Sequence, residues 1–311
     1  MILSLFFADS LNKENLYQFF AIISEKRESV VAIRWYNMSR MVKPHMKKHE
    51  RKKRSKTFKV LVALIIALGV FELVAFGALA VYISDYEHAD ADAEAAMKSG
   101  HGVQVTRTDD WIEFSLPARG QVDTCTRDGN DIVTVDTGIV FYPGGKVEYT
   151  AYAPLMREFA KKGYFCAVVK MPFNLAVLDA NAAKDVKEAH PEISKWIIGG
   201  HSLGGVMAAK YAAISDFDGL FLLAAYANTD LSDKDIPVVS VYGDADGVLN
   251  MDEYEASKGN LPADMTEHVI KGGNHSQFGS YGLQEGDGKA TISPEDQRAQ
   301  AVKFVLEDLT K

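Results

Sequence analysis

Apolar and polar positions alternate in short blocks along the C-terminal two-thirds of the chain. Short segments with the pattern expected of strands fall at residues 103–109, 111–116, 138–142, 164–171, 195–200, 219–226, 237–243 and 267–273. Between them, apolar residues recur at helical spacing at residues 148–162, 176–190, 203–214 and 294–309. Apolar strands alternating with helices are typical of a parallel sheet covered on both faces. We therefore expect one α/β domain over residues 103–311, with a mostly parallel sheet that begins with two antiparallel strands.

A much longer apolar run precedes this domain. Residues Val60 to Ile83, VLVALIIALGVFELVAFGALAVYI, are 24 residues with a single charge, Glu72. A helix of that length reaches about 36 Å, which is enough to cross the hydrocarbon core of a bilayer. A buried core helix would be shorter and amphipathic. The run therefore predicts a transmembrane helix over residues 60–83.

The charges around this run predict its orientation. Residues 1–59 hold 14 Lys or Arg and 5 Asp or Glu. The rest of the chain holds 20 Lys or Arg and 37 Asp or Glu. Because basic flanks stay in the cytoplasm, we expect a single-pass cell-membrane protein with a cytoplasmic N-terminus and an extracytoplasmic domain. Ala78-Leu79-Ala80 has the spacing of a signal-peptidase site, so cleavage and secretion are the alternative. The length of the run favours an uncleaved anchor.

Two flanking segments complete the predicted domain organisation. Residues 1–59 form a basic N-terminal segment. We expect residues 1–40 not to be translated, since a start at Met38, Met41 or Met46 would place a compact basic region before the span. Residues 84–102 are acidic and rich in alanine, and they are expected to be a linker or short helix.

The stretch GGHSLGG, residues 199–205, lies between a predicted strand and a predicted helix. Gly-x-Ser-x-Gly in this context is a nucleophile elbow, in which a strained turn raises the serine hydroxyl above the sheet edge. Side chains at Gly200 and Gly204 would collide with the tight strand–helix packing. The alternative is a turn with Ser202 as an ordinary helix N-cap. The context favours Ser202 as a nucleophile.

A serine nucleophile needs a base, and the base needs an orienting acid. In the elbow fold the chain order is Ser, then Asp or Glu, then His, in loops after later strands. Asp246 follows the run at 237–243, and His275 follows the run at 267–273. Competing candidates are Asp244, Asp252 and His268, while His201 is expected to pack beneath the elbow.

Backbone amides complete the predicted site. The Leu203 amide follows the serine at the start of a helix and is placed to bind an oxyanion. The second amide is expected from the loop Pro143-Gly144-Gly145-Lys146, from Gly144 or Gly145. An EF-hand starting at Asp244 is excluded because Leu249 stands where glycine is required. No zinc motif occurs, and no metal or cofactor is expected.

Residues 103–309 resemble the α/β-hydrolase superfamily. The resemblance rests on GGHSLGG together with FYPGGKVEYTAYAPL (141–155), VVKMPFNLAVLD (168–179), YGDADGV (242–248) and GGNHSQFGSYG (272–282). These stretches are similar to the compact bacterial branch related to dienelactone hydrolases. The resemblance implies an α/β-hydrolase fold with Ser202 as nucleophile, Asp246 as acid and His275 as base. Dienelactone hydrolases use a cysteine nucleophile, so their particular reaction is not implied.

The sequence thus predicts a membrane-anchored serine hydrolase that cleaves an ester or related acyl bond of a small molecule. Alternatives are a non-catalytic binding module, or a peptidase, thioesterase or acyltransferase with the same triad.

Only residues 227–236 separate two strands where related enzymes insert a lid, so the site is expected to be open. The acidic domain gives no indication of nucleic-acid binding. Cys125 and Cys166 are expected either to remain separate or to form a disulfide.

Overall fold

The computed structural model describes residues 56–117 and 136–309, which belong to two compact units. One unit ends at Asp85 and the other begins at Tyr86. The predictions for residues 1–55, including the untranslated segment, lie outside the described residues.

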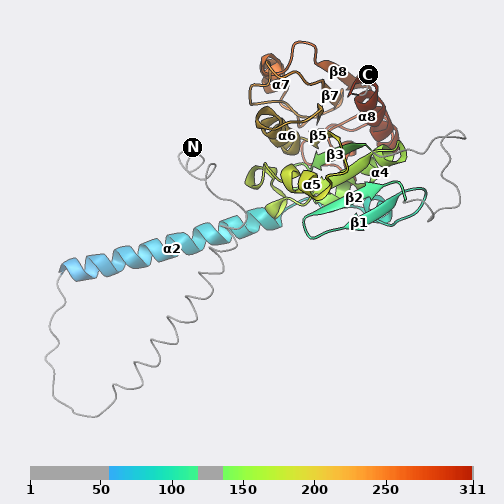
Figure 1. Cartoon of the computed structure of the whole chain (residues 1–311). Helices are drawn as coiled ribbons and strands as arrows, with labels where there is room; N and C mark the ends of the chain where they lie inside the picture. Colours follow the sequence, from blue (N-terminus) through green and yellow to red (C-terminus); the bar gives the residue numbers. More distant parts are fainter. Residues whose placement is uncertain (1–55, 118–135, 310–311) are drawn as a thin grey trace, which may run out of the picture. The chain divides into compact units, whose positions relative to one another are not determined.

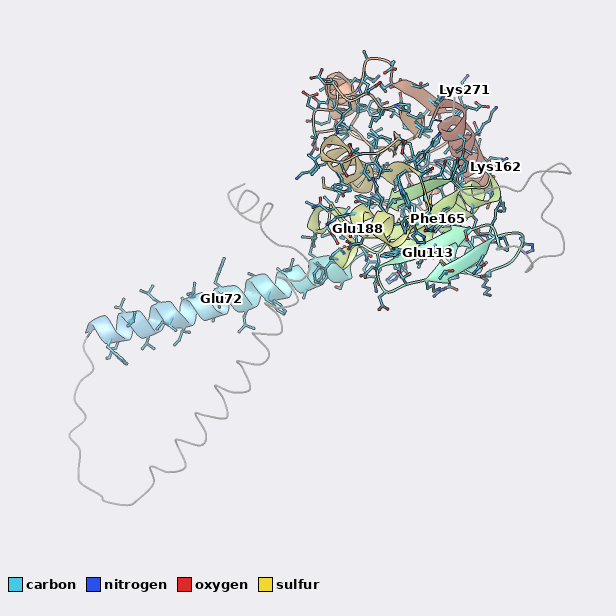
Figure 2. All side chains as sticks on the ribbon, viewed as in Figure 1. Glu72, Glu113, Lys162, Phe165, Glu188 and Lys271 are labelled. Carbon is cyan, nitrogen blue, oxygen red and sulfur yellow. The ribbon has the colours of Figure 1, made fainter. Side chains whose placement is uncertain are left out.

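Helix α2, Lys56–Ser84, is the described part of the first unit. Its apolar side chains are exposed on all sides of the helix, and Figure 2 labels Glu72 within it. The segment Phe58–Ser84 is apolar enough and long enough to cross a membrane, by length and composition alone. This agrees with the apolar span expected over residues 60–83.

The second unit is built on one eight-stranded sheet with the order β1-β2-β4-β3-β5-β6-β7-β8 (Figure 1). The strands are β1 Gln104–Arg107, β2 Trp111–Ser115, β3 Thr137–Tyr142, β4 Phe165–Val169, β5 Lys195–His201, β6 Gly219–Leu223, β7 Val238–Gly243 and β8 Thr266–Ile270. Strands β1 and β2 are antiparallel to their neighbours, and all pairs from β4 to β8 are parallel. Every strand predicted from the sequence is present, which confirms a mostly parallel sheet.

Helices cover both faces of the sheet. They are α3 Ala91–Ala96, α4 Ala153–Lys161, α5 Ala183–Ala189, α6 Leu203–Ile214, α7 Met251–Ser257 and α8 Pro294–Leu309, with 3₁₀ turns η1 Tyr149–Tyr152, η2 Pro172–Asn174, η3 Ala176–Leu178, η4 Lys258–Asn260 and η5 Ser276–Phe278. In β3, Ile139 and Phe141 pack in a core with α4 and α8, whereas Val140 and Tyr142 pack in a core with α5 and α6. Because both faces are buried, the strand reads as a continuous apolar run.

Residues 84–102, expected to be a linker or short helix, contain the short helix α3 and are folded onto the domain from Tyr86 onward. The amide of Glu87 donates to the Lys146 carbonyl (2.7 Å), and the amide of Asp90 donates to the Ser280 carbonyl (2.9 Å). Ala93 in α3 and Met97 after it are buried. The acids at its start are explained by capping, since the Asp90 carboxylate accepts two amides of the first turn of α3.

Two further expectations concern the loops and the cysteines. Residues 224–237, between β6 and β7, contain no helix. This agrees with the expectation that no helical lid is inserted between these two strands. Cys166 lies buried in β4 and forms no disulfide within the part of the chain that the structure describes. Cys125 lies outside the described residues.

Arg157 in α4 fastens the folded segment to the domain. Its buried guanidinium donates to the carbonyls of Ala96, Lys98 and Gly100. We expect Arg157→Gln to lower the free energy of unfolding by about 2 kcal/mol, because partly buried carbonyls lose a charged donor. Thermal unfolding of the detergent-solubilised chain measures this change.

The matched control is Lys161→Gln on the same helix. Lys161 pairs with Glu158 at the exposed surface, so its loss should change stability by less than about 0.5 kcal/mol. Equal effects of the two substitutions would contradict the role given to Arg157.

Candidate active site

Ser202 occupies a strained junction between β5 and α6. Its backbone has φ 51° and ψ −127°, a conformation that is unfavourable for a residue with a side chain. A Cβ at Gly200 would lie 2.5 Å from the carbonyl carbon of Gly204, and one at Gly204 would overlap the backbone oxygens of Tyr142 and Pro143. Backbone atoms cannot move aside, so both positions require glycine, as the elbow motif predicts.

The Ser202 side chain makes no capping hydrogen bond to helix α6. The alternative reading of this serine as an ordinary N-cap is therefore wrong. The strain at Ser202 is not offset by a cap, and the hydroxyl is free for another role.

Asp246 and His275 form a buried pair at the carboxyl edge of the sheet. The distance from Asp246 Oδ2 to His275 Nδ1 is 2.9 Å, and the two side chains are 2% and 1% exposed. The other Asp246 oxygen accepts the amides of Val248 and Leu249, which fixes the carboxylate. A carboxylate accepts the Nδ1 proton, so Nε2 of His275 is left as the unprotonated nitrogen.

The competing candidates lie elsewhere. Asp244 Oδ1 accepts the amide of Gly272, and Asp252 lies exposed in the first turn of α7. His268 lies within β8, where it contacts Asp308 at 2.6 Å and stacks on Phe304. None of the three contacts the Asp246–His275 pair through a hydrogen bond within the described residues.

No hydrogen bond joins Ser202 to His275 among the described residues. Nε2 of His275 is buried and has no partner among the described residues. The link between them is His201, the neighbour of Ser202, whose ring centroid lies 4.4 Å from that of His275. Hydrogen bonds of this kind are often long before substrate binds and shorten in the complex.

The loop after β3 supplies one free amide beside the elbow. The Gly144 amide already donates to the Tyr152 hydroxyl (3.0 Å), so the expectation that it binds an oxyanion is wrong for this conformation. A Cβ at Gly145 would lie 2.8 Å from the Leu203 side chain, so Gly145 borders the elbow. The amides of Gly145 and Leu203 have no partner in the described ranges. Both amides are therefore unpaired at the elbow.

The sequence did not indicate Asp287, which ties the two acid–base loops together. Its Oδ1 accepts the amides of Gly247 and His275, and its Oδ2 accepts the amide and hydroxyl of Ser276. Partial burial alone would raise the pKa of the Asp287 carboxyl, but these hydrogen bonds outweigh it and hold the pKa below its usual value. Its neighbours in sequence, Gly286 and Gly288, look like an ordinary turn, so no local signal marked it.

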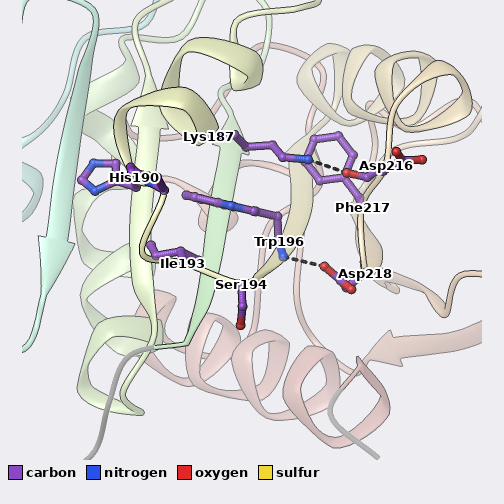
Figure 3. Close-up of a pocket in the computed structure, with 9 residues that line it drawn as sticks. Lys187, His190, Ile193, Ser194, Trp196, Asp216, Phe217 and Asp218 are labelled. Atoms are coloured by element: carbon purple, nitrogen blue, oxygen red, sulfur yellow. Dashed lines mark hydrogen bonds between the residues drawn. The ribbon is translucent and has the colours of Figure 1, made fainter.

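A surface hollow of about 420 Å³ lies at the other end of β5 (Figure 3). Trp196 lines it, and its amide donates to Asp218. Lys187 lies over the Phe217 ring. Because Trp196 lies near the start of β5 and Ser202 follows the end of that strand, this hollow is separate from the candidate site. Among the described residues, no group of three or more His, Cys, Asp or Glu side chains is arranged to hold a metal.

A parallel sheet covered on both faces, with a strained serine and an Asp–His pair at its carboxyl edge, defines the class of α/β hydrolases. The sequence model described as the alpha/beta hydrolase family matches residues 138–299. This is just over half of the chain, and the chain belongs to that family.

Several solved structures are similar to this chain. A predicted CIB-like hydrolase from Thermoplasma acidophilum has 14% identity and a TM-score of 0.48, covering 67% of this chain and 100% of that one. Esterase 2 of Thermogutta terrifontis in its apo form has 16% identity and a TM-score of 0.46, covering 68% and 96%. Its propionate-bound form has 16% identity and a TM-score of 0.44, covering 67% and 94%. No curated protein sequence matches this chain.

Replacing Asp287 tests the link between the acid and base loops. We expect Asp287→Asn to lower the free energy of unfolding by about 2 kcal/mol at pH 7, because charge-assisted hydrogen bonds are lost. Since the folded-state pKa lies below the unfolded value of about 3.9, the carboxylate stabilises the fold fully above that value. This contribution disappears as the pH falls through the folded-state pKa.

Thermal unfolding between pH 3 and pH 7 measures the difference between wild type and variant, which should shrink towards pH 3. Glu285→Gln, at an exposed neighbouring carboxylate, is the control and should match the wild type at every pH. A constant difference across the range would show that the charge of Asp287 does not contribute.

Proposed function

We propose that this chain is a membrane-anchored serine hydrolase that cleaves an ester or related acyl bond of a small molecule. The observation that carries the proposal is the combination of the strained, uncapped Ser202 with a buried Asp246–His275 pair whose imidazole lies 4.4 Å from the ring of His201, the neighbour of Ser202. A binding module needs neither the backbone strain nor the buried pair. We also propose, on the sequence motifs alone, that the chain is related to the dienelactone-hydrolase branch of the family.

The chemistry follows from the geometry. Nε2 of His275 takes the proton from Ser202 as its oxygen attacks the carbonyl carbon, and Asp246 stabilises the resulting imidazolium. The amides of Gly145 and Leu203 donate to the oxyanion of the tetrahedral intermediate. His275 then passes the proton to the leaving group, which departs and leaves an acyl-Ser202. A water molecule, deprotonated by His275, attacks the acyl carbon, and His275 returns the proton to the Ser202 oxygen as the acid is released.

The loops around Ser202 carry no helical lid within the described residues, which favours small or exposed acyl groups. The net negative charge of the domain disfavours anionic substrates. The mechanism proposed here requires no metal or cofactor.

Asparagine substitution at two neighbouring aspartates tests the triad. We expect a fluorophosphonate probe to label Ser202 of the full chain in detergent. Asp246→Asn should slow labelling and ester hydrolysis by about 10⁴-fold, because His275 is then held in the wrong tautomer. Asp244→Asn should keep the wild-type rate, since Asp244 contacts the Gly272 amide and not His275.

Peptide mass spectrometry identifies the labelled residue, and Ser202→Ala is the negative control. A wild-type chain that is folded but unlabelled would exclude the serine-hydrolase proposal and favour a binding module. Equal loss in Asp244→Asn and Asp246→Asn would contradict the assignment of the acid.

Fractionation tests the proposed anchor, which rests on α2 and the basic residues before it. We expect the chain to stay in the membrane pellet after alkaline carbonate extraction. Protease added to intact spheroplasts should digest the domain beginning at Tyr86, because the basic flank is retained in the cytoplasm. A cytoplasmic reporter protein is the control and should survive until the cells are permeabilised.

Recovery of the domain in the medium, lacking α2, would instead show that the helix is a cleaved signal. Protection of the membrane-bound domain from protease would show the opposite topology.

A further inference from the structure

Two fully buried side chains beneath the candidate site are not part of the proposed triad. The Tyr152 hydroxyl lies 3.0 Å from the Gly144 amide and 2.8 Å from Nδ1 of His201. It therefore joins the loop after β3 to the residue next to Ser202. A Cβ at Gly144 would lie 2.7 Å from the hydroxyl and 2.9 Å from Nδ1, so the three groups fill this space.

The hydrogen bonds assign the protons. An amide can only donate, so the Tyr152 oxygen accepts from Gly144. The hydroxyl hydrogen then has one remaining acceptor, Nδ1 of His201. In the other tautomer, both the hydroxyl hydrogen and Nε2 of His201 would be buried without a partner, whereas the assigned tautomer leaves only the Nε2–H unpaired. His201 is therefore a neutral imidazole with its proton on Nε2, the opposite tautomer from His275.

The charge state of His201 agrees with this assignment. Burial, followed by the neighbouring His275, lowers the pKa of His201 well below its usual value. Since the rings of His201 and His275 are 4.4 Å apart, a charged His201 would oppose the imidazolium that forms on His275 during acyl transfer. A neutral His201 supports the His275 ring without this repulsion. Phe278 packs against His201 as well, with ring centroids 5.7 Å apart.

We propose that Tyr152 and His201 are a positioning pair for the hydrolytic site. The Tyr152 hydroxyl holds the Gly144 amide inward, which leaves the Gly145 amide to face the oxyanion. The same hydroxyl fixes the tautomer of His201, whose ring holds His275 beside Ser202. This inference rests on the proposed serine-hydrolase function and adds two residues that do not themselves touch the substrate.

Two tyrosines make a matched comparison. Tyr142 is also fully buried, and its hydroxyl also accepts one amide, from Ala183, and donates to one acceptor, the Ala180 carbonyl. It contacts neither the Gly144 amide nor His201 through a hydrogen bond. Tyr152→Phe and Tyr142→Phe therefore remove equivalent buried hydroxyls, and we expect them to lower the thermal midpoint by similar amounts.

Only the Tyr152 variant should change the chemistry. We expect Tyr152→Phe to reduce both the rate of fluorophosphonate labelling of Ser202 and kcat for p-nitrophenyl acetate by about 10- to 100-fold. KM should change much less, because an oxyanion donor acts in the transition state. Tyr142→Phe should stay within about threefold of wild type in both measurements.

Substitution of His201 gives an independent readout. Asparagine places an amide oxygen near the position of Nδ1 and can still accept from Tyr152, whereas leucine cannot. We expect His201→Asn to label at least about fivefold faster than His201→Leu at 25 °C. A purely space-filling role for His201 would reverse this order, since leucine fills more of the buried volume with apolar atoms.

The outcomes separate this inference from the function on which it rests. Failure of the wild-type chain to be labelled would remove the proposed function and the positioning pair with it. Normal labelling of wild type together with equal rates in both tyrosine variants would remove the positioning pair alone. Parallel losses in Tyr152→Phe and Tyr142→Phe would show that Tyr152 acts only through stability.

Discussion

The contact between the end of β5 and the first turn of α6 is the constraint on which the candidate site depends. Gly200 packs directly on the backbone of Gly204, and Gly204 packs on the backbone at Tyr142 and Pro143. This approach forces Ser202 into its positive-φ conformation and places the first amides of α6 at the sheet edge. The loop after β3 is brought to the same point, so its Gly145 amide borders Leu203. One backbone junction thus sets the position of the serine and of both available amides.

The sequence predicted this junction because its requirements are local. A strand, a glycine pair around a serine, and a following helix are adjacent in the chain, and each has a recognisable pattern. The order of Asp246 and His275 was also readable, because the elbow fold places the acid and then the base in loops after later strands. Their pairing in the structure agrees with that expectation, and the competing Asp244 and His268 have other partners.

Hydrogen bonds between distant segments were not readable from the sequence. Tyr152 occupies an apolar position of a predicted helix, and only the fold reveals that its hydroxyl meets Gly144 and His201. The choice between the Gly144 and Gly145 amides depends on that one contact. The attachment of residues 86–102 to the domain was not readable for a related reason. Their acidic, alanine-rich composition suggests a linker or short helix, and only the fold shows that main-chain hydrogen bonds and the Arg157 guanidinium hold the segment in place.

In the part of the chain that the structure describes, buried polar side-chain atoms without a hydrogen-bond partner lie at or close to the residues to which the chemistry is assigned. Within the described residues, the buried side-chain atoms without a hydrogen-bond partner are Nε2 of His201, Nε2 of His275 and Oε1 of Gln277. Burying such groups unpaired lowers stability, and folds normally avoid it. The groups around Nε2 of His275 do have partners. Asp246 pairs with Nδ1 of His275, and the Asp287 carboxylate accepts amides of the loop that carries His275. The fold therefore holds the orientation of these side chains firmly while leaving Nε2 of His275 unsatisfied. An acceptor that is fixed in position and lacks a donor is what a serine hydroxyl needs when it must lose its proton.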